Sequence, residues 1–321
     1  ITRQPTQYRA DGDDGSVFTG SAKYVVESAV HLLNGGGGGT ISFGSGVFDL
    51  GPDYFQLHQV SHIVFEGQGI DNTVIQNNTS VAADTEPFNF SGAFFITIRD
   101  MTVAARGAPR STSDALDFDD GNDSTVERVK IIASRARGIV FDGKNTGWDS
   151  LRNRVIDCVI QDVPGDGIEF LASSQNEVRG CDIRDTALHG IQMSKSSTTA
   201  DQPNKPANNN LITGNRVENA GLDGINVNSS SDNRITGNTV LNSSDDAASR
   251  DGIRILSSND IACDRNEVSG NTATDNQSVK TQRYGLHISS SFCTANIVGT
   301  NSLAGNRVGP IRDVGSGTIY N

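Results

Sequence analysis

The chain of 321 residues carries a short motif seven times, and this repeat limits the folds open to it. Its common form is a polar residue, a glycine, an isoleucine, a second polar residue and an apolar residue, as in Asp166-Gly167-Ile168-Glu169-Phe170, with departures at Ala115, Leu116, Val140 and Leu286. Two intervals between copies are 23 residues, and the others are 28 to 34, which is one period plus an insertion. Such a period without helical patterning predicts one coil of a stacked β-solenoid per copy. The copies begin at Asp114, Arg137, Asp166, His189, Asp223, Asp251 and Tyr284.

Alternation along each predicted strand assigns the motif to two faces. Successive side chains point to opposite sides, so Ile168 is expected in the core and Glu169 outside it. Coils stacked about 4.8 Å apart would align the second polar residues into one outward column, with the first polar residues beside it. We expect Asp166 and His189 to point away from the core and to take no part in backbone bonds between coils. The second polar positions hold Asp117, Val140, Glu169, Gln192, Asn226, Arg254 and His287.

The composition fits an elongated repeat and argues against several partners. Hydrophobic residues make up 35% of the chain and aromatic residues 6%, which is low for a globule but enough for the thin core of a solenoid. A net charge of −12 argues against nucleic acid and anionic membrane surfaces as partners. No segment is long and apolar enough to predict a membrane span. The uninterrupted repeat favours a single domain over residues 1–321, with coils from 41 to 321.

Residues 1–40 are predicted to form an N-terminal segment and a capping helix. Apolar residues between 21 and 33 follow a helical period, Ser21 is suited to the N-cap, and Asn34 with the glycines after it is expected to end the helix. A solenoid needs a cap because its first coil would otherwise expose core and unpaired strand edge. Residues 40–43 and 46–50 are predicted to be the first strands.

Four cysteines fall at matching places of neighbouring coils. Cys158 and Cys181 are 23 residues apart, and Cys263 and Cys293 each stand three residues before an asparagine. Each pair is expected to stack close to disulfide distance, and spacing alone leaves a disulfide and two reduced core thiols equally open. Asparagine also recurs at one turn of successive coils, as at Asn215, which predicts a structural ladder between coils.

The start of the chain resembles that of pectate-lyase-like right-handed parallel β-helix proteins. The shared features are Ala10-Asp11-Gly12-Asp13-Asp14, the amphipathic helix, the glycine run 35–39 and Thr40. The resemblance implies an all-β fold, a single right-handed parallel β-helix (β-solenoid) with an N-terminal amphipathic capping helix. It also implies a family of mainly polysaccharide lyases, epimerases and glycosidases, and therefore a polysaccharide or oligosaccharide substrate.

Two further resemblances imply different chemistry on the outward face. The coil Leu188-His189-Gly190-Ile191-Gln192, which follows the Asp166 coil, resembles consecutive coils of mannuronan C5-epimerase catalytic modules. A Tyr, an Asp and a His of the preceding coil in those modules are absent here. The order of Asp114, Asp166, His189 and Arg254 resembles that of polygalacturonase-type glycosidases, with extra coils in between. The sequence leaves both chemistries open.

The predicted catalytic centre lies at the middle of the outward face. Arg137 would neutralise a substrate carboxylate, His189 would move a proton and Asp166 would orient His189. Glu169 and Asp142 stand beside them, and neighbouring carboxylates can keep one of their number protonated as an acid. The residues expected to bind substrate are Asp114, Asp117, Lys144, Trp148, Gln192, Lys195, Asp223, Asn226, Asp251, Arg254, Tyr284 and His287.

Long insertions flank the outward columns on both sides and predict the walls of a groove. They span residues 142–151, 194–210, 242–250 and 269–283. Trp148, the sole tryptophan, lies in the first insertion and is expected to stack on a sugar ring. An acidic groove repels a polyanion, and a Ca²⁺ held by Asp117, Asp119 or Asp142 would offset this repulsion. The sequence assigns no metal ligands beyond this possibility.

Three functions fit these features. The leading one is a secreted enzyme of lyase or C5-epimerase type that acts on a uronic-acid-containing glycan. The second is a glycoside hydrolase or glycosyl (fructosyl) transferase on a neutral glycan, with Asp166 and either Glu169 or Asp142 as paired carboxylates. The third is a non-catalytic glycan-binding solenoid. The expected location is secreted, extracellular or periplasmic, and neither nucleic acid nor a membrane is expected as a partner.

Overall fold

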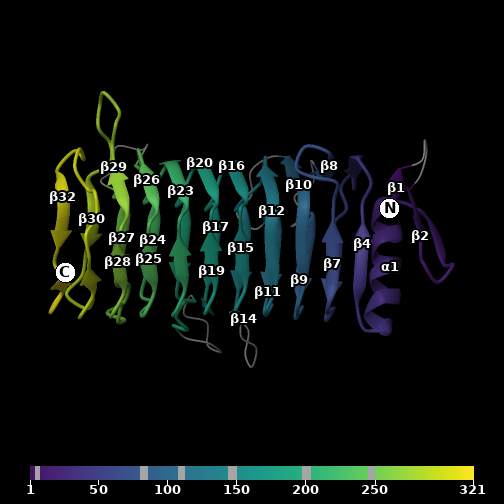
Figure 1. Ribbon diagram of the computed structural model, residues 1–321, viewed down its shortest axis with the longest axis horizontal. Helices are drawn as coiled ribbons and strands as arrows, with labels where there is room; N and C mark the ends of the chain where they lie inside the picture. Colours follow the sequence, from purple (N-terminus) through teal and green to yellow (C-terminus); the bar gives the residue numbers. More distant parts are fainter. Residues whose placement is uncertain (4–7, 80–85, 108–112, 144–149, 197–203, 245–249) are drawn as a thin grey trace.

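The computed structural model shows parallel strands stacked coil upon coil along one axis (Figure 1). The structure describes residues 1–3, 8–79, 86–107, 113–143, 150–196, 204–244 and 250–321. Helix α1 (Ala22–Gly36) covers one end of the stack, and strand β32 (Gly309–Asp313) lies at the other end with the C-terminus. This arrangement confirms the predicted solenoid and its capping helix.

One face of the solenoid is a sheet of ten strands, which holds the seven copies of the motif. All its neighbouring strands are parallel and in register. In order along the stack, its strands are β6 (Phe55–His58), β9 (Phe88–Ser91), β11 (Leu116–Asp119), β13 (Ile139–Asp142), β17 (Ile168–Leu171), β21 (Ile191–Ser194), β24 (Ile225–Asn228), β27 (Ile253–Leu256), β30 (Tyr284–Ile288) and β32.

Two further stacks of parallel strands close the coils, and the long strands β10 (Thr97–Gly107) and β12 (Thr125–Ile132) belong to both. The first stack also contains β4 (Gly39–Ser42), β7 (Ile63–Glu66), β15 (Arg154–Ile156), β19 (Glu177–Arg179), β22 (Leu211–Thr213), β25 (Arg234–Thr236), β28 (Glu267–Ser269), β31 (Ile297–Val298) and β33 (Ile319–Tyr320). The second contains β5 (Gly46–Asp49), β8 (Thr73–Thr79), β16 (Val159–Val163), β20 (Asp182–Thr186), β23 (Arg216–Ala220), β26 (Thr239–Leu241) and β29 (Thr272–Thr274).

The helical cap follows from local sequence. The Ser21 side chain accepts a hydrogen bond from the Tyr24 backbone N–H, and Val25, Val26 and Val30 are buried against the first coil. The helix runs three residues past its predicted end and stops at Gly37, which has a left-handed backbone conformation. Within the described ranges, no helix is long and apolar enough to cross a membrane. The remaining short strands are β1 (Thr2–Arg3), β2 (Tyr8–Asp11), β3 (Val17–Gly20), β14 (Ser150–Leu151) and β18 (Ser173–Ser174).

The repeated motif is explained by the way its coils pack. Ile168 is fully buried and lies in register with the isoleucines of the coils on either side. The apolar residue that ends each copy forms a stack of rings in the early coils, in which Phe118 and Phe141 lie 4.6 Å apart. Glycine is required because a Cβ atom at Gly138 would collide with the carbonyl oxygen of Gly167 on the next coil.

Asparagine side chains link the turns of successive coils, which confirms the predicted ladder. The Oδ1 atom of Asn238 accepts the backbone N–H of Asn215 at 3.0 Å, and the Oδ1 atom of Asn271 accepts that of Asn238 at 2.9 Å. The sequence predicted one ladder, but the structure has a second one along another turn. It runs through Asn153, Asn176, Asn210, Asn233, Asn266 and Asn296. Each buried amide therefore satisfies a backbone donor that the turn would leave without a partner.

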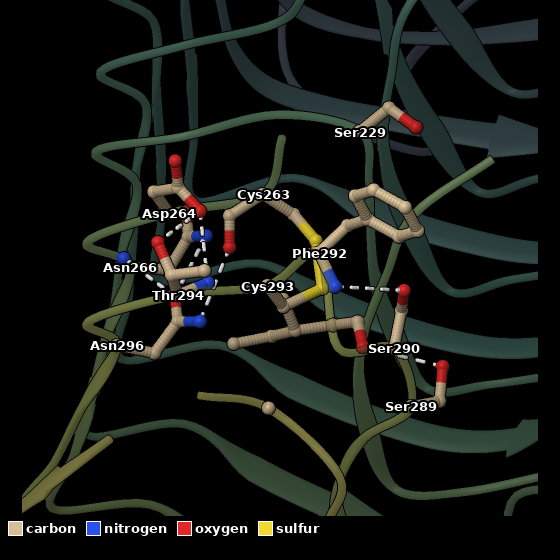
Figure 2. The surroundings of a disulfide bond; sticks show 12 residues. Ser229, Cys263, Asp264, Asn266, Ser289, Ser290, Phe292, Cys293, Thr294 and Asn296 are labelled. Carbon is tan, nitrogen blue, oxygen red and sulfur yellow. Dashed lines mark hydrogen bonds between the residues drawn. A yellow bond between two sulfur atoms is a disulfide. The ribbon is translucent and has the colours of Figure 1, made fainter. Parts of the chain in front are cut away.

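The two cysteine pairs stack as predicted but differ in their bonding. Cys263 and Cys293 form a disulfide with their Cα atoms 4.5 Å apart, beside the ladder residues Asn266 and Asn296 (Figure 2). Cys158 and Cys181 precede register partners on β16 and β20, are buried, and are free thiols. Burial raises the pKa of the Cys158 thiol well above its usual range, and the neighbouring Cys181 adds to the increase.

Candidate functional site

The outward residues of the motif form one continuous column on the ten-stranded sheet. Register pairs join Asp117 to Val140, Val140 to Glu169, and so on to His287, as the alternation predicts. The column is longer than the motif indicates. Gln56 and Asn89 extend it at the helix-capped end and Arg312 extends it at the other end. These coils lack the glycine-isoleucine pair. Apolar and polar residues alternate in β6 and β9, whereas in β32 Asp313 follows Arg312.

The first polar residues of the motif do not form a second exposed column. Asp114, Asp166, Asp223 and Asp251 are buried, and each carboxylate accepts the backbone N–H at the matching position of the next coil. Asp166 accepts that of His189 at 2.8 Å. The expectation that Asp166 takes no part in bonding between coils is therefore wrong, because a carboxylate beside the strand end satisfies a backbone donor there.

Arg137 is held between two buried carboxylates at the middle of the face. Its Nη2 atom lies 2.8 Å from Asp114 Oδ2, and its Nη1 atom lies 2.5 Å from Glu169 Oε2. Glu169 also accepts hydrogen bonds from Gln192 and Ser194 at 3.0 Å. Burial raises the pKa of Glu169, as does the nearby Asp166 charge, while Arg137 opposes the increase. Because both carboxylates pair with Arg137, the positive charge of Arg137 is largely compensated within the protein.

His189 is engaged at both ring nitrogens. Nδ1 lies 2.9 Å from Asp166 Oδ1, and Nε2 lies 2.9 Å from the Asn226 side-chain nitrogen and 3.6 Å from Asp223 Oδ2. Burial lowers the pKa of the imidazole, but the two carboxylates outweigh it and raise this pKa to about 9. His189 is therefore mainly a cation at neutral pH, within a buried network that includes the predicted partners Asp166, Asp223 and Asn226.

Asp117 is the least engaged of the acidic groups on the face. It is partly exposed, and its carboxyl group has no hydrogen-bond partner among the described residues. Burial raises its pKa well above the usual range, and the charges of Asp119, Asp114 and Glu86 add to this. Asp142 is buried and lies in register with Asp119. In the described part of the chain, no three His, Cys, Asp or Glu side chains are grouped for a metal ion, so the suggested Ca²⁺ stays a prediction.

A second imidazole–carboxylate pair lies nearer the C-terminal end of the face. His287 Nδ1 is 2.9 Å from Asp251 Oδ2, and Arg283 donates to both oxygens of Asp251 at 3.0 and 2.7 Å. Burial raises the pKa of Asp251, but His287 and Arg283 outweigh it and hold this pKa below its usual value. The Tyr284 ring lies 5.5 Å from the His287 ring and 5.2 Å from the Arg283 guanidinium.

The insertions that flank the face are described only in part. Lys195 donates to the Asn204 side chain at 2.9 Å, and Lys205 reaches across to the Gly143 carbonyl at 2.9 Å. Lys144 and Trp148 lie outside the described residues, so their predicted contacts with substrate stay predictions. A surface hollow around Pro164, Asp185, Thr186 and Asn219 contains none of the predicted site residues. The predicted groove therefore rests on the sequence pattern of the insertions.

Comparison with known proteins places the chain in a family. The family model for a right-handed beta helix region matches residues 58–205 and 153–321. These matches cover most of the sequence, and the chain belongs to the right-handed β-helix family. Comparison with curated proteins finds no match.

Solved structures share the whole architecture at low sequence identity. A mannuronan C-5 epimerase A-module from Azotobacter vinelandii matches with a TM-score of 0.59 and 16% identity, over 94% of this chain and 95% of the module. The Agl-KA catalytic domain matches with a TM-score of 0.58 and 15% identity, over 98% of this chain and 67% of that domain's chain. An N-terminal fragment of bacteriophage phi29 gene product 12 matches with a TM-score of 0.60 and 14% identity, over 87% of this chain and 55% of the fragment. These likenesses concern the fold.

Proposed function

We propose that this protein is a secreted enzyme that acts on a polysaccharide laid along the ten-stranded sheet, by lyase or C5-epimerase chemistry at a uronic acid. The observation that carries the proposal is the presence of two imidazole–carboxylate pairs on one face, Asp166–His189 and Asp251–His287, each at 2.9 Å. Imidazole held by a carboxylate is suited to moving a proton. The shared architecture with a protein named as a mannuronan epimerase supports a polysaccharide as substrate.

Removal of the proton beside a uronate carboxylate requires a positive charge near that carboxylate and a group that takes the proton. The face supplies both kinds of group, because Arg254 lies partly exposed in its outward column at 18% side-chain exposure. A lyase then breaks the bond to the C4 oxygen, whereas an epimerase returns a proton to the opposite side of C5. The disulfide Cys263–Cys293 supports an oxidising, extracellular or periplasmic location.

Hydrolysis of a neutral glycan is the second candidate, and Asp117 is the observation that favours it. A partly exposed carboxyl group without a described hydrogen-bond partner, and with its pKa raised well above the usual range, is suited to protonate a glycosidic oxygen. Glu169 lies two coils away in the same column, beyond Val140, at about 9–10 Å by strand spacing. That separation is near the upper end of the range for inverting glycosidases.

A panel of glycans read in two ways tests the proposal. Acidic and neutral polysaccharides are incubated with the protein, and products are followed by absorbance at about 235 nm and by new reducing ends. NMR of the acidic polymers detects epimerised residues that neither reading shows. An unsaturated or epimerised product supports the proposal, and reducing ends without either favour hydrolysis. Binding without any product would make the protein a glycan-binding solenoid.

A further inference from the structure

The two imidazole–carboxylate pairs differ in what their outer nitrogen does. In His189, Nε2 lies 2.9 Å from the Asn226 side-chain nitrogen and 3.6 Å from Asp223 Oδ2, so protein groups enclose this nitrogen. In His287, Nε2 has no hydrogen-bond partner among the described residues, although the side chain is only 6% exposed. His287 Nε2 is not one of the buried side-chain atoms that lack a partner, so it reaches solvent and is open to a ligand. His287 is thus the imidazole with a nitrogen left for a ligand.

Asp251 and Arg283 both contact the Nδ1 atom of His287. Nδ1 lies 2.9 Å from Asp251 Oδ2, and an unprotonated Nδ1 would set two lone pairs against each other at that distance. Arg283 Nη2 lies 2.8 Å from the same Nδ1 and donates to Asp251 Oδ2 at 2.7 Å. Asp251 is completely buried and also accepts the Tyr284 backbone N–H, which keeps the carboxylate in place. In the proposed site the proton is on Nδ1, where Asp251 accepts it, and Nε2 presents its lone pair.

The neighbours of His287 in the outward column are both arginines. Arg254 lies in register on β27 and Arg312 lies in register on β32, so each is about one strand spacing away. The Arg254 guanidinium donates to Ser289 and lies 3.8 Å from Asp223, which leaves it partly exposed. Arg312 is exposed and pairs with no carboxylate in the described part of the chain. The central arginine, Arg137, is by contrast bound to two carboxylates.

We propose that the proton-transfer site lies at His287 and takes an acidic sugar whose carboxylate binds between Arg254 and Arg312. This inference rests on the proposed function and moves its centre from His189 to the strands β27, β30 and β32, which lie together near the C-terminal end of the stack (Figure 1). The Asp166–His189 pair then belongs to a charge network that holds the middle coils together.

The chemical step balances without a co-reactant. The C5–H bond of the uronate breaks, its proton moves to His287 Nε2, and the electron pair is delocalised into the carboxylate held by the two arginines. The imidazolium keeps its Nδ1 proton against Asp251. In elimination the pair forms the C4–C5 double bond, the C4–O bond breaks, and the leaving oxygen takes up a proton. In epimerisation a water molecule donates a proton to C5 from the opposite side, and the resulting hydroxide takes the proton held by His287.

Imidazole NMR of the whole chain tests the site independently of activity. The chain has five histidines, so the ring nitrogens of His287 and His189 can be assigned with His287→Gln and His189→Gln. Oligosaccharides of alginate and of polygalacturonate are added, with a neutral cello-oligosaccharide as a control. We expect the acidic oligosaccharides to shift His287 Nε2, and Arg254→Gln to weaken this binding about tenfold, as the loss of one charge-assisted contact does.

Turnover of whichever polyuronate is converted completes the test. His287→Gln should lower turnover by about 10² or more, whereas His58→Gln, an exposed histidine on β6, should not change it. A shift at His287 without turnover would uphold the acidic-sugar site and contradict the proposed enzyme activity. Full turnover in His287→Gln would overturn the inference and leave the proposed function intact. Absence of any His287 shift with both acidic oligosaccharides would overturn it as well.

Discussion

The first polar residue of the motif, where it is an aspartate, binds a backbone N–H of the next coil. Asp166 accepts both the backbone N–H and the ring Nδ1–H of His189, and it is 4% exposed. Asp166→Ala should lower the free energy of unfolding by about 1–3 kcal/mol, because a buried donor loses its acceptor. Urea unfolding measures this change. Asp166→Asn keeps an acceptor oxygen and should lose less, and an alanine variant as stable as the wild type would contradict the assigned bond.

His189 makes stability depend on pH in a defined window. Its pKa rises from 6.5 to about 9 on folding because of Asp166 and Asp223. The extra stability of the charged imidazole is fully present below pH 6.5 and is lost as pH rises through about 9. The loss should amount to about 3 kcal/mol, at 1.36 kcal/mol for each pKa unit. Urea unfolding of the wild type and His189→Gln at pH 6 and 9.5 checks this, and the same pH dependence in both would contradict it.

A substitution at Ile168 tests which residues of its strand face the core. Ile168 is completely buried between the isoleucines of its neighbouring coils, so Ile168→Ala leaves a cavity. The free energy of unfolding should fall by about 2–5 kcal/mol. Thermal unfolding followed by circular dichroism measures it. Gln192→Ala, an outward change on the next strand, is the matched control and should cost far less; equal losses would mean that the strand phase is misassigned.

At the scale of elements, a disulfide links two coils covalently. Cys263 and Cys293 close a segment with a sequence separation of 30 residues. Replacement of both cysteines by serine should lower the free energy of unfolding by about 2–4 kcal/mol, through greater freedom of the unfolded chain. Guanidinium unfolding of the wild type with and without a reductant provides the comparison. Identical unfolding midpoints under the two conditions would show that the bond contributes nothing.

Strand and turn assignments were predictable because they depend on local spacing. Period-two alternation fixed which residues face the core, and the recurring asparagines marked the ladders. The helix end was predicted three residues early, because the helix continues through Asn34 and two glycines before Gly37 turns. The partner of a polar side chain was less predictable. Asp114 and Asp166 have the same spacing as surface residues. Only the structure shows that their carboxylates accept backbone N–H groups of the next coil.

The same limit applies to the candidate site. The sequence placed Arg137, Glu169, His189 and His287 on one face, and the structure does so too. The sequence predicted His189 as catalytic and His287 as a binding residue, and it could not show the contact between Asn226 and His189, which are 37 residues apart in the chain. Arg312 was missed because its coil lacks the motif and has Asp313 in register with the apolar Ile288.

At the scale of the molecule, charge is distributed unevenly along the face. The net charge is −12, and in the middle coils Arg137 and His189 are each bound between carboxylates. Toward the C-terminal end, Arg254 and Arg312 flank His287 with less compensation. An acidic glycan should therefore bind nearer this end than the middle, despite the overall negative charge, and its binding should weaken as salt is raised.

Exchange of the C5 proton in D₂O is the most direct test of proton transfer on this face. Lyase and epimerase chemistry both break the C5–H bond of a uronate, whereas hydrolysis leaves it intact. Alginate and polygalacturonate are incubated with the protein in D₂O and followed by NMR and mass spectrometry of the products. The account predicts that the product either carries deuterium at C5 or has lost the C5 hydrogen to a new C4–C5 double bond. It also predicts a decrease of about 10² in rate with His287→Gln. New reducing ends with C5–H fully retained would contradict it.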